Sequence, residues 1–162
     1  MTRRSWSPTN SSRNCATTEA STTLFDVNAL VALALTTHQH HHAAHRFLAG
    51  LDGSWATTGL TEAGLFKLLL NPRITGSQRL AAEVTEILRG MRADPRWTFL
   101  DDSTSLADPL VDTAVLMGHR QVTDLHLVNL VARHGGVLAT FDAAIPSWLA
   151  PRDRSRVVLV PS

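Results

Sequence analysis

From Thr22 onward, short runs of apolar residues alternate with longer segments in which apolar residues recur every three or four positions. Short apolar runs are typical of buried strands, and a period near 3.6 residues is typical of helices that bury one face. Their alternation predicts an α/β domain. The predicted strands are Thr22–Phe25, Trp55–Thr57, Trp97–Leu100, Val137–Phe141 and, at one edge, Arg156–Val160.

The helix-period segments are bounded by residues that cap or break helices. Asn28 and Thr123 stand where N-caps are expected, since their side chains accept hydrogen bonds from a first helical turn. Gly50 and Gly135 stand where helices are expected to stop. The predicted helices are Ala29–Leu35, His41–Leu48, a helix from about Thr61 that Pro72 ends, a helix that starts near Ser77, Leu106–Met117, and Thr123–His134.

Residues 1–21 differ from the rest of the chain. Ser, Thr and Asn dominate, and apart from Met1 the only large apolar residue is Trp6. Such a segment buries too little surface to offset the cost of ordering it, about 1–2 kcal/mol per residue for the backbone. We therefore expect a disordered N-terminal tail followed by a single domain over residues 22–162.

The composition of the chain argues against a polycationic nucleic-acid binder and against a membrane-spanning protein, but it does not indicate one activity. The 162 residues are 44% hydrophobic and 18% charged, and 15 basic against 14 acidic residues leave a net charge of +1. Nucleic-acid affinity would therefore need a local site, because the chain is not polycationic. Cys15 is the only cysteine, and the longest apolar run, Ala29–Leu35, is far shorter than the ~20 residues that span a bilayer. We expect a cytoplasmic protein with no membrane contact.

Four acidic residues fall at corresponding places in this pattern. Asp26 and Asp142 each follow an apolar strand, and Glu62 and Asp124 each lie in the first turn of a predicted helix. Ligands of open parallel sheets bind at the carboxyl ends of the strands. All four acids are therefore expected at one edge of the sheet.

If the four carboxylates converge, each pair at ~5 Å repels by about 3 kcal/mol at an effective dielectric constant of ~20. Such a cluster needs a cation or must hold protons at neutral pH. Oxygen ligands favour Mg²⁺ or Mn²⁺, and these ions serve phosphoryl transfer and phosphodiester hydrolysis. A single Asp at a strand end is more often only a cap or turn residue, so the prediction depends on the four together.

The residues around these acids form four short motifs. In chain order they are Phe25-Asp26-Val27-Asn28-Ala29-Leu30, Thr61-Glu62-Ala63-Gly64-Leu65, Val122-Thr123-Asp124-Leu125-His126-Leu127 and Leu138-Ala139-Thr140-Phe141-Asp142. With these motifs the chain resembles PIN-domain ribonucleases, and most of all the toxin of a VapBC-type toxin–antitoxin pair, from about Thr22 to Val160. One departure is Lys67, which stands where similar sequences commonly have Arg.

The resemblance implies a three-layer α/β/α domain with a central parallel sheet. It also implies Mg²⁺-dependent RNA cleavage (Mn²⁺ being possible), a homodimer, and inhibition by a cognate VapB-type antitoxin. It assigns catalysis to Asp26, Glu62, Asp124 and Asp142, and assigns the metal to Asp26, Asp124 and Asp142. It assigns a supporting role to Asn28, Thr123 and Thr140.

Three other interpretations stay open. An aspartyl phosphatase would normally place a second Asp where this chain has Asn28, and would need a suitably placed Lys, whereas Lys67 is the only one. A catalytically silent PIN-like module that binds RNA or antitoxin would show binding without cleavage. The histidines between His38 and His45 could hold zinc, form a polar helix face, or contact RNA or antitoxin.

Overall fold

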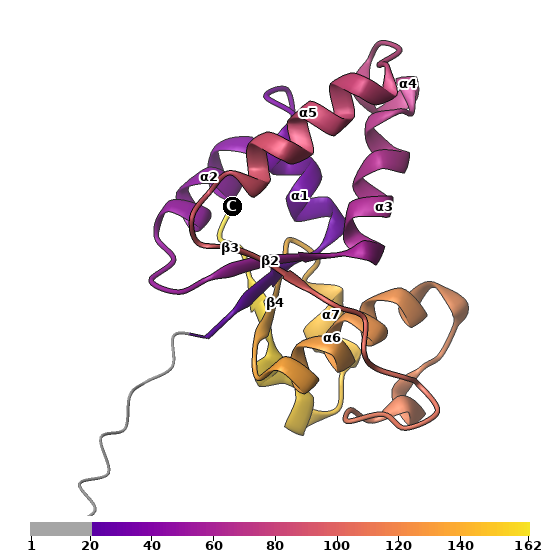
Figure 1. The fold of residues 1–162 in the computed structure, drawn as a ribbon. Coiled ribbons are helices and arrows are strands. Elements are labelled where there is room, and N and C mark those ends of the chain that lie inside the picture. Colours follow the sequence, from indigo (N-terminus) through magenta and orange to yellow (C-terminus); the bar gives the residue numbers. More distant parts are fainter. Residues whose placement is uncertain (1–20) are drawn as a thin grey trace, which may run out of the picture.

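Five parallel strands form one sheet in the order β3-β2-β1-β4-β5 in the computed structural model, which describes residues 21–162 (Figure 1). Each strand lies within two residues of its predicted bounds, and β5 is the predicted edge strand. The expected tail lies outside the described residues, apart from Ser21. The strands are β1 (Thr23–Phe25), β2 (Trp55–Thr58), β3 (Trp97–Leu100), β4 (Val137–Thr140) and β5 (Val157–Leu159).

Helices cover both faces of this sheet, which confirms the three-layer α/β/α architecture (Figure 1). One face is covered by α1 (Val27–Ala34), α2 (His41–Ala49), α3 (Gly59–Leu69), α4 (Pro72–Thr75) and α5 (Ala81–Arg92). The other face is covered by α6 (Val122–His134) and α7 (Ala144–Trp148). No helix within residues 21–162 is long and apolar enough to cross a membrane.

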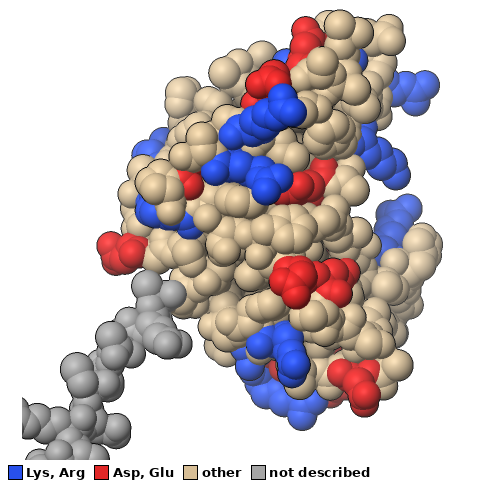
Figure 2. All heavy atoms as spheres, in the orientation of Figure 1, with Lys and Arg blue, Asp and Glu red and all other residues tan. Residues whose placement is uncertain are grey.

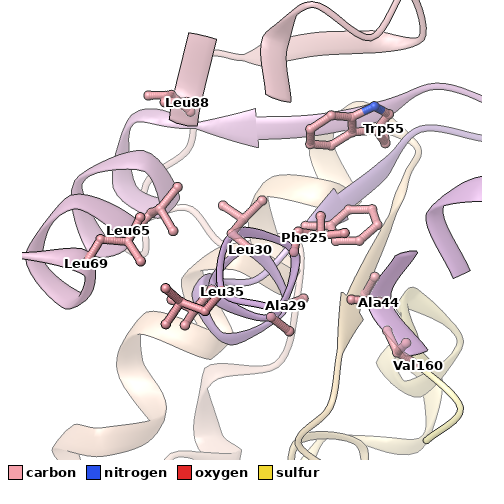
Figure 3. Close-up of a cluster of buried hydrophobic side chains, with 14 of the residues drawn as sticks. Phe25, Ala29, Leu30, Leu35, Ala44, Trp55, Leu65, Leu69, Leu88 and Val160 are labelled. Atoms are coloured by element: carbon pink, nitrogen blue, oxygen red, sulfur yellow. The ribbon is translucent and has the colours of Figure 1, made fainter. Parts of the chain in front are cut away.

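Two apolar cores hold the three layers together. Phe25 points into the core beneath α1, α3 and α5, where its ring lies edge-on to those of Trp55 and Phe47 at 5.6 and 5.9 Å (Figure 3). The neighbouring Leu24 points into the second core, against α6 and Leu138. Successive strand residues face opposite layers, and both layers are apolar. This arrangement explains why β1 and β4 read as continuous apolar runs rather than as alternating ones.

Helices α1 and α3 approach each other closely at Gly64. A Cβ atom built on Gly64 would lie 2.6 Å from Val27 Cγ2, so no larger residue fits there without movement. Val27 is the first residue of α1 and directly follows Asp26, while Gly64 lies two residues after Glu62. The contact therefore fixes the start of α1 against the middle of α3.

Three predicted helix starts are wrong. Asp26, rather than Asn28, caps α1, because its Oδ1 accepts from the backbone N–H of Ala29 at 2.6 Å. Gln121 occupies the N-cap of α6, so Thr123 lies inside the first turn. The helix expected near Ser77 begins only at Ala81, where the side chain of Glu83 accepts from the preceding backbone N–H.

The predicted helix Leu106–Met117 is also wrong. This segment is irregular apart from a 3₁₀ turn over Thr113–Val115. Two of its backbone N–H groups bond to distant buried side chains instead of to preceding carbonyls: Leu110 donates to Asn129 Oδ1 at 2.8 Å, and Asp112 donates to Asp153 Oδ2 at 3.0 Å. Tertiary hydrogen bonds thus replace those of a helix.

Candidate functional site

The carboxyl ends of β1 and β4 lie side by side at the centre of the sheet. The chain passes from β1 to β2 on one side, whereas β4 pairs with β1 from the other side. Sheets of this kind bind ligands at such a reversal, because the connections leave a crevice there. The two strands stay paired up to the site, where the N–H of Asp26 donates to the carbonyl of Ala139 at 3.1 Å.

Asp26 is buried at the end of β1, with 4% of its surface exposed. Its Oδ1 caps α1, and its Oδ2 accepts from Thr140 Oγ1 at 2.5 Å. Burial raises the pKa of the Asp26 carboxyl above its usual range, and the negative charge of Asp142 raises it further, although the hydrogen bonds from Thr140 and Ala29 act in the opposite direction. The sequence therefore places a carboxylate where its negative charge is costly.

Thr140 is the last residue of β4 and is fully buried. Its hydroxyl accepts from the backbone N–H of Asp142 at 3.0 Å. A backbone N–H can only donate, so the single hydroxyl proton is left for Asp26. Thr140 thereby links two of the predicted acids through its side chain.

Asp142 lies two residues after β4 and is exposed. Its Oδ1 accepts from the backbone N–H of Ala144 at 2.8 Å, at the start of α7. This short helix was not predicted. Asp142 also lines a pocket with Asn28 and Phe141, and its charge acts on the buried Asp26.

Asp124 projects from the first turn of α6, on the opposite layer from α1. Its pKa is raised to about 6, first by burial and then by the charges of Asp26 and Asp142. A carboxyl in a first helical turn would ordinarily be favoured in its charged form. Burial is the largest cause of this opposite shift, and the smaller contributions of Asp26 and Asp142 indicate that the three aspartates lie close enough to repel one another.

Glu62 is held on the β2 side of the same edge. Its Oε1 accepts from Thr57 Oγ1 at 2.7 Å, and that hydroxyl in turn accepts from Trp97 Nε1 at 3.1 Å. Thr57 is fully buried on β2, and Trp97 lies on β3. The sequence analysis did not find Thr57 or Trp97 as site residues, because a strand threonine and a strand tryptophan carry no local sign of this contact.

Two residues expected to support the acids do not contact them through their side chains. Thr123 is exposed on α6, and within residues 21–162 its hydroxyl makes no hydrogen bond to a carboxylate. Asn28 is also exposed, and only its backbone N–H acts on Asp26. Of the three predicted supporting residues, Thr140 alone bonds an acid through its side chain.

The arrangement suits a hydrated cation better than a closed metal cage. Across residues 21–162, no three His, Cys, Asp or Glu side chains stand close enough to hold a metal ion by themselves. Mg²⁺ commonly uses one or two carboxylates and keeps several waters, so it does not require such a cage. Burial, and to a lesser degree mutual repulsion, raises the pKa values of Asp26 and Asp124, and a nearby cation would favour their ionised forms.

Charge is mixed on the face of the molecule that Figure 2 shows. On the face drawn in Figure 2, basic and acidic side chains are interspersed over a mostly uncharged surface. This agrees with the net charge of +1. This face therefore carries no extended basic patch of the kind that binds a polyanion without a specific site.

Comparison with known proteins identifies the family. No protein-family model matches the chain. Three ribonucleases of Mycobacterium tuberculosis are similar to it: VapC38 is 41% identical over 85% of this chain and 96% of its own length. VapC39 is 39% identical over 76% and 91%, and VapC29 is 36% identical over 87% and 98%. With these identities along nearly the whole of each relative, and with the acids gathered at the reversal of the sheet, the chain belongs to the VapC ribonuclease family.

Proposed function

We propose that the protein is a metal-dependent endoribonuclease and the toxin of a VapBC-type toxin–antitoxin pair. The observation that carries the proposal is the group of Asp26, Asp124 and Asp142, contributed by three separate elements. The pKa of Asp124 is raised to about 6 by burial and by the other two charges. A folded protein retains such repulsion where function needs the charges, and perturbed carboxyls in a crevice are typical of active sites.

The metal in this proposal is Mg²⁺, with Mn²⁺ as a substitute, and Asp26, Asp124 and Asp142 would hold it directly or through water. When bound, such an ion lowers the pKa of water and stabilises charge on phosphate oxygens. The protein's own part is to keep the carboxylates in place. Thr140 fixes Asp26, and Thr57 fixes Glu62 beside the crevice. Glu62 is well placed to orient a water or to accept its proton.

The proposed substrate is RNA in a single-stranded segment. The bases of such segments can unstack and bind beside the crevice, whereas a paired helix keeps its bases stacked and paired. Lys67 on α3 and Arg120 before α6 are exposed cations that could contact neighbouring phosphates. The same proposal places the protein in the cytoplasm, together with its substrate.

We also propose a homodimer and a VapB-type antitoxin as partners. Exposed apolar side chains on and between α3, α4 and α5 support a protein contact in this part of the molecule, where solvent exposure of such residues is unfavourable. They include Leu70, Ile74 and Leu80, exposed by 38%, 47% and 68%. An Ile74→Glu variant is expected to weaken self-association or antitoxin binding, as measured by analytical ultracentrifugation.

The test of the activity is cleavage of total RNA by the purified protein, with cut sites mapped by sequencing of the new 5′ ends. We expect cleavage at defined sites with Mg²⁺ or Mn²⁺, and none with EDTA or with the Asp26→Asn variant. RNA binding without cleavage at any concentration of either ion would instead support the silent binding module.

A further inference from the structure

Two of the five histidines of residues 38–45 bond to the end of α1, and two others line a pocket. His41 Nδ1 donates to the carbonyl of Ala32 at 2.8 Å, and His45 Nε2 donates to the carbonyl of Leu33 at 3.1 Å. Both carbonyls lie in the last turn of α1, where no helical N–H is available. These two histidines therefore complete α1, and this explains them without a metal.

His38 and His40 lie elsewhere, in the connection between α1 and α2. With Gln39 they form one side of a pocket of about 270 Å³, whose other side is formed by Asn28, Phe141 and Asp142. Asp142 belongs to the acidic group and Asn28 lies two residues after Asp26, so the pocket opens beside the proposed site of cleavage. A pocket of this volume has room for one flat, base-sized group.

The aromatic wall of this pocket is already ordered. The rings of His40 and Phe141 are stacked, with centroids 4.4 Å apart and planes 12° from parallel. The backbone N–H of His40 donates to His38 Nδ1 at 3.2 Å, and the side chains of Gln39 and His40 are 3.2 Å apart at their nitrogens. A wall held in this way loses little conformational freedom on binding.

We propose that this pocket binds the base of a nucleotide next to the scissile phosphodiester, with the His40–Phe141 pair as its stacking surface. Bases of single-stranded RNA stack on Phe and His rings and hydrogen-bond through their edges. The amides of Asn28 and Gln39 offer both donors and acceptors for such an edge. This inference rests on the proposed ribonuclease function and names a subsite of that same crevice.

The experiment measures RNA binding separately from cleavage. All proteins carry Asp26→Asn, and the probe is a short, labelled single-stranded RNA of random sequence, followed by fluorescence anisotropy. Adding His40→Ala is expected to weaken binding about tenfold or more, the typical effect of losing one stacked base. His40→Phe, which keeps the ring, is expected to retain binding.

The control is His42→Ala, an exposed neighbour on α2 that does not line the pocket and should bind RNA as the parent does. Once a cut site has been mapped, an RNA centred on that site allows two further measurements. These are the cleavage kinetics of proteins with Asp26 intact and the binding by proteins that carry Asp26→Asn. An abasic ribose at the flanking position should reduce binding by the parent to the level of His40→Ala, and should have no further effect on that variant.

Equal RNA binding by His40→Ala and His42→Ala would overturn the proposal. So would a His40→Ala variant that binds RNA normally but loses affinity for the antitoxin, because the pocket would then serve a protein. A different result would show that the proposed ribonuclease function is wrong. In that case the protein with Asp26 intact would cleave no RNA, whatever these binding assays show.

Discussion

Trp97 donates to Thr57 across two neighbouring strands, from Nε1 to Oγ1 at 3.1 Å. An indole N–H can only donate, so the hydroxyl must accept there and turn its one proton toward Glu62, 2.7 Å away. Thr140 is constrained in the same manner by the backbone N–H of Asp142, and turns its proton toward Asp26. A threonine on each side of β1 thus orients an acid of the crevice.

Replacing Thr57 by Val should therefore impair catalysis with little change of shape. Loss of the hydroxyl frees Glu62 and leaves the N–H of Trp97 without its partner. We expect kcat/KM to fall about 10- to 100-fold, and the free energy of unfolding to fall by about 1–3 kcal/mol. Thr57→Ser keeps the hydroxyl and is the matched control; equal activity of the Val and Ser variants would contradict the positioning role.

Asp26→Asn and Asp26→Ala should differ in stability but not in activity. Both remove the carboxylate, so cleavage should fall at least about 100-fold in each. The Asn side chain can still accept from Ala29 and cap α1, whereas Ala cannot. We expect Asp26→Ala to be less stable than Asp26→Asn by about 1–3 kcal/mol in urea denaturation. Full Mg²⁺-dependent cleavage by Asp26→Asn would exclude the proposed mechanism.

Asp124→Asn should stabilise the metal-free protein in a pH-dependent manner. The folded pKa of about 6 lies above the ordinary value of 3.8, so folded protein binds more protons than unfolded protein between these values. The free energy of unfolding of the parent therefore falls as pH rises through this window. In EDTA, the gain in Tm should be small near pH 4, grow up to about pH 6 and level off above it. A gain that is the same at every pH would contradict the shift.

The same proton should compete with the metal. Binding of Mg²⁺ requires ionised carboxylates, and Asp124 takes up a proton below about pH 6. The apparent Mg²⁺ affinity, measured by calorimetry or by the shift in Tm, should fall about tenfold or more per pH unit below that value. Asp124→Asn is expected to bind Mg²⁺ more weakly at neutral pH and to lose part of this pH dependence, while the raised pKa of Asp26 sustains the rest. Affinity that is constant between about pH 5 and pH 7 would count against Asp124 as a ligand.

Gly64→Ala should destabilise the domain although Ala favours helices. The new methyl would meet Val27 Cγ2 at 2.6 Å, and a β-branched side chain has little freedom to turn away. We expect a loss of about 1–3 kcal/mol in denaturant unfolding. Combining it with Val27→Ala removes the clash and should restore part of the loss, whereas additive losses would show that the two residues are not coupled.

Much of the fold was predictable because the strands are buried on both sides. Continuous apolar runs mark β1 and β4 clearly in the sequence. The positions of Asp26 and Asp142 at the edge of the sheet follow from where these runs end. Helix caps were harder, since Asp26 and Asn28 both have capping side chains two residues apart and only the strand length decides between them. The segment Leu106–Met117 has helical periodicity, but Asn129 and Asp153 take its N–H groups from far along the chain.

The positions of the acids were more predictable than what holds them. Asp26 and Asp142 lie where the ends of β1 and β4 require, and Asp124 lies in the expected helical turn. The roles of Thr57 and Trp97 depend on the register of β2 against β3, which pairs Trp55 with Trp97 and Thr57 with Phe99. No local pattern in a single sequence encodes that register. The stacked pair of His40 and Phe141 likewise joins residues about a hundred positions apart.

The carboxylate of Asp26 serves both the stability of the fold and the proposed catalysis, so a substitution there affects both. One oxygen starts the first helix and the other meets Thr140, so a descendant that discards the carboxylate for a plain methyl loses part of its scaffold at the same moment. Asparagine is the substitution that silences the site at little cost to the fold. Homologues that have lost ribonuclease activity but still fold should therefore carry Asn at this position more often than Ala. A comparison of homologous sequences would reveal that bias.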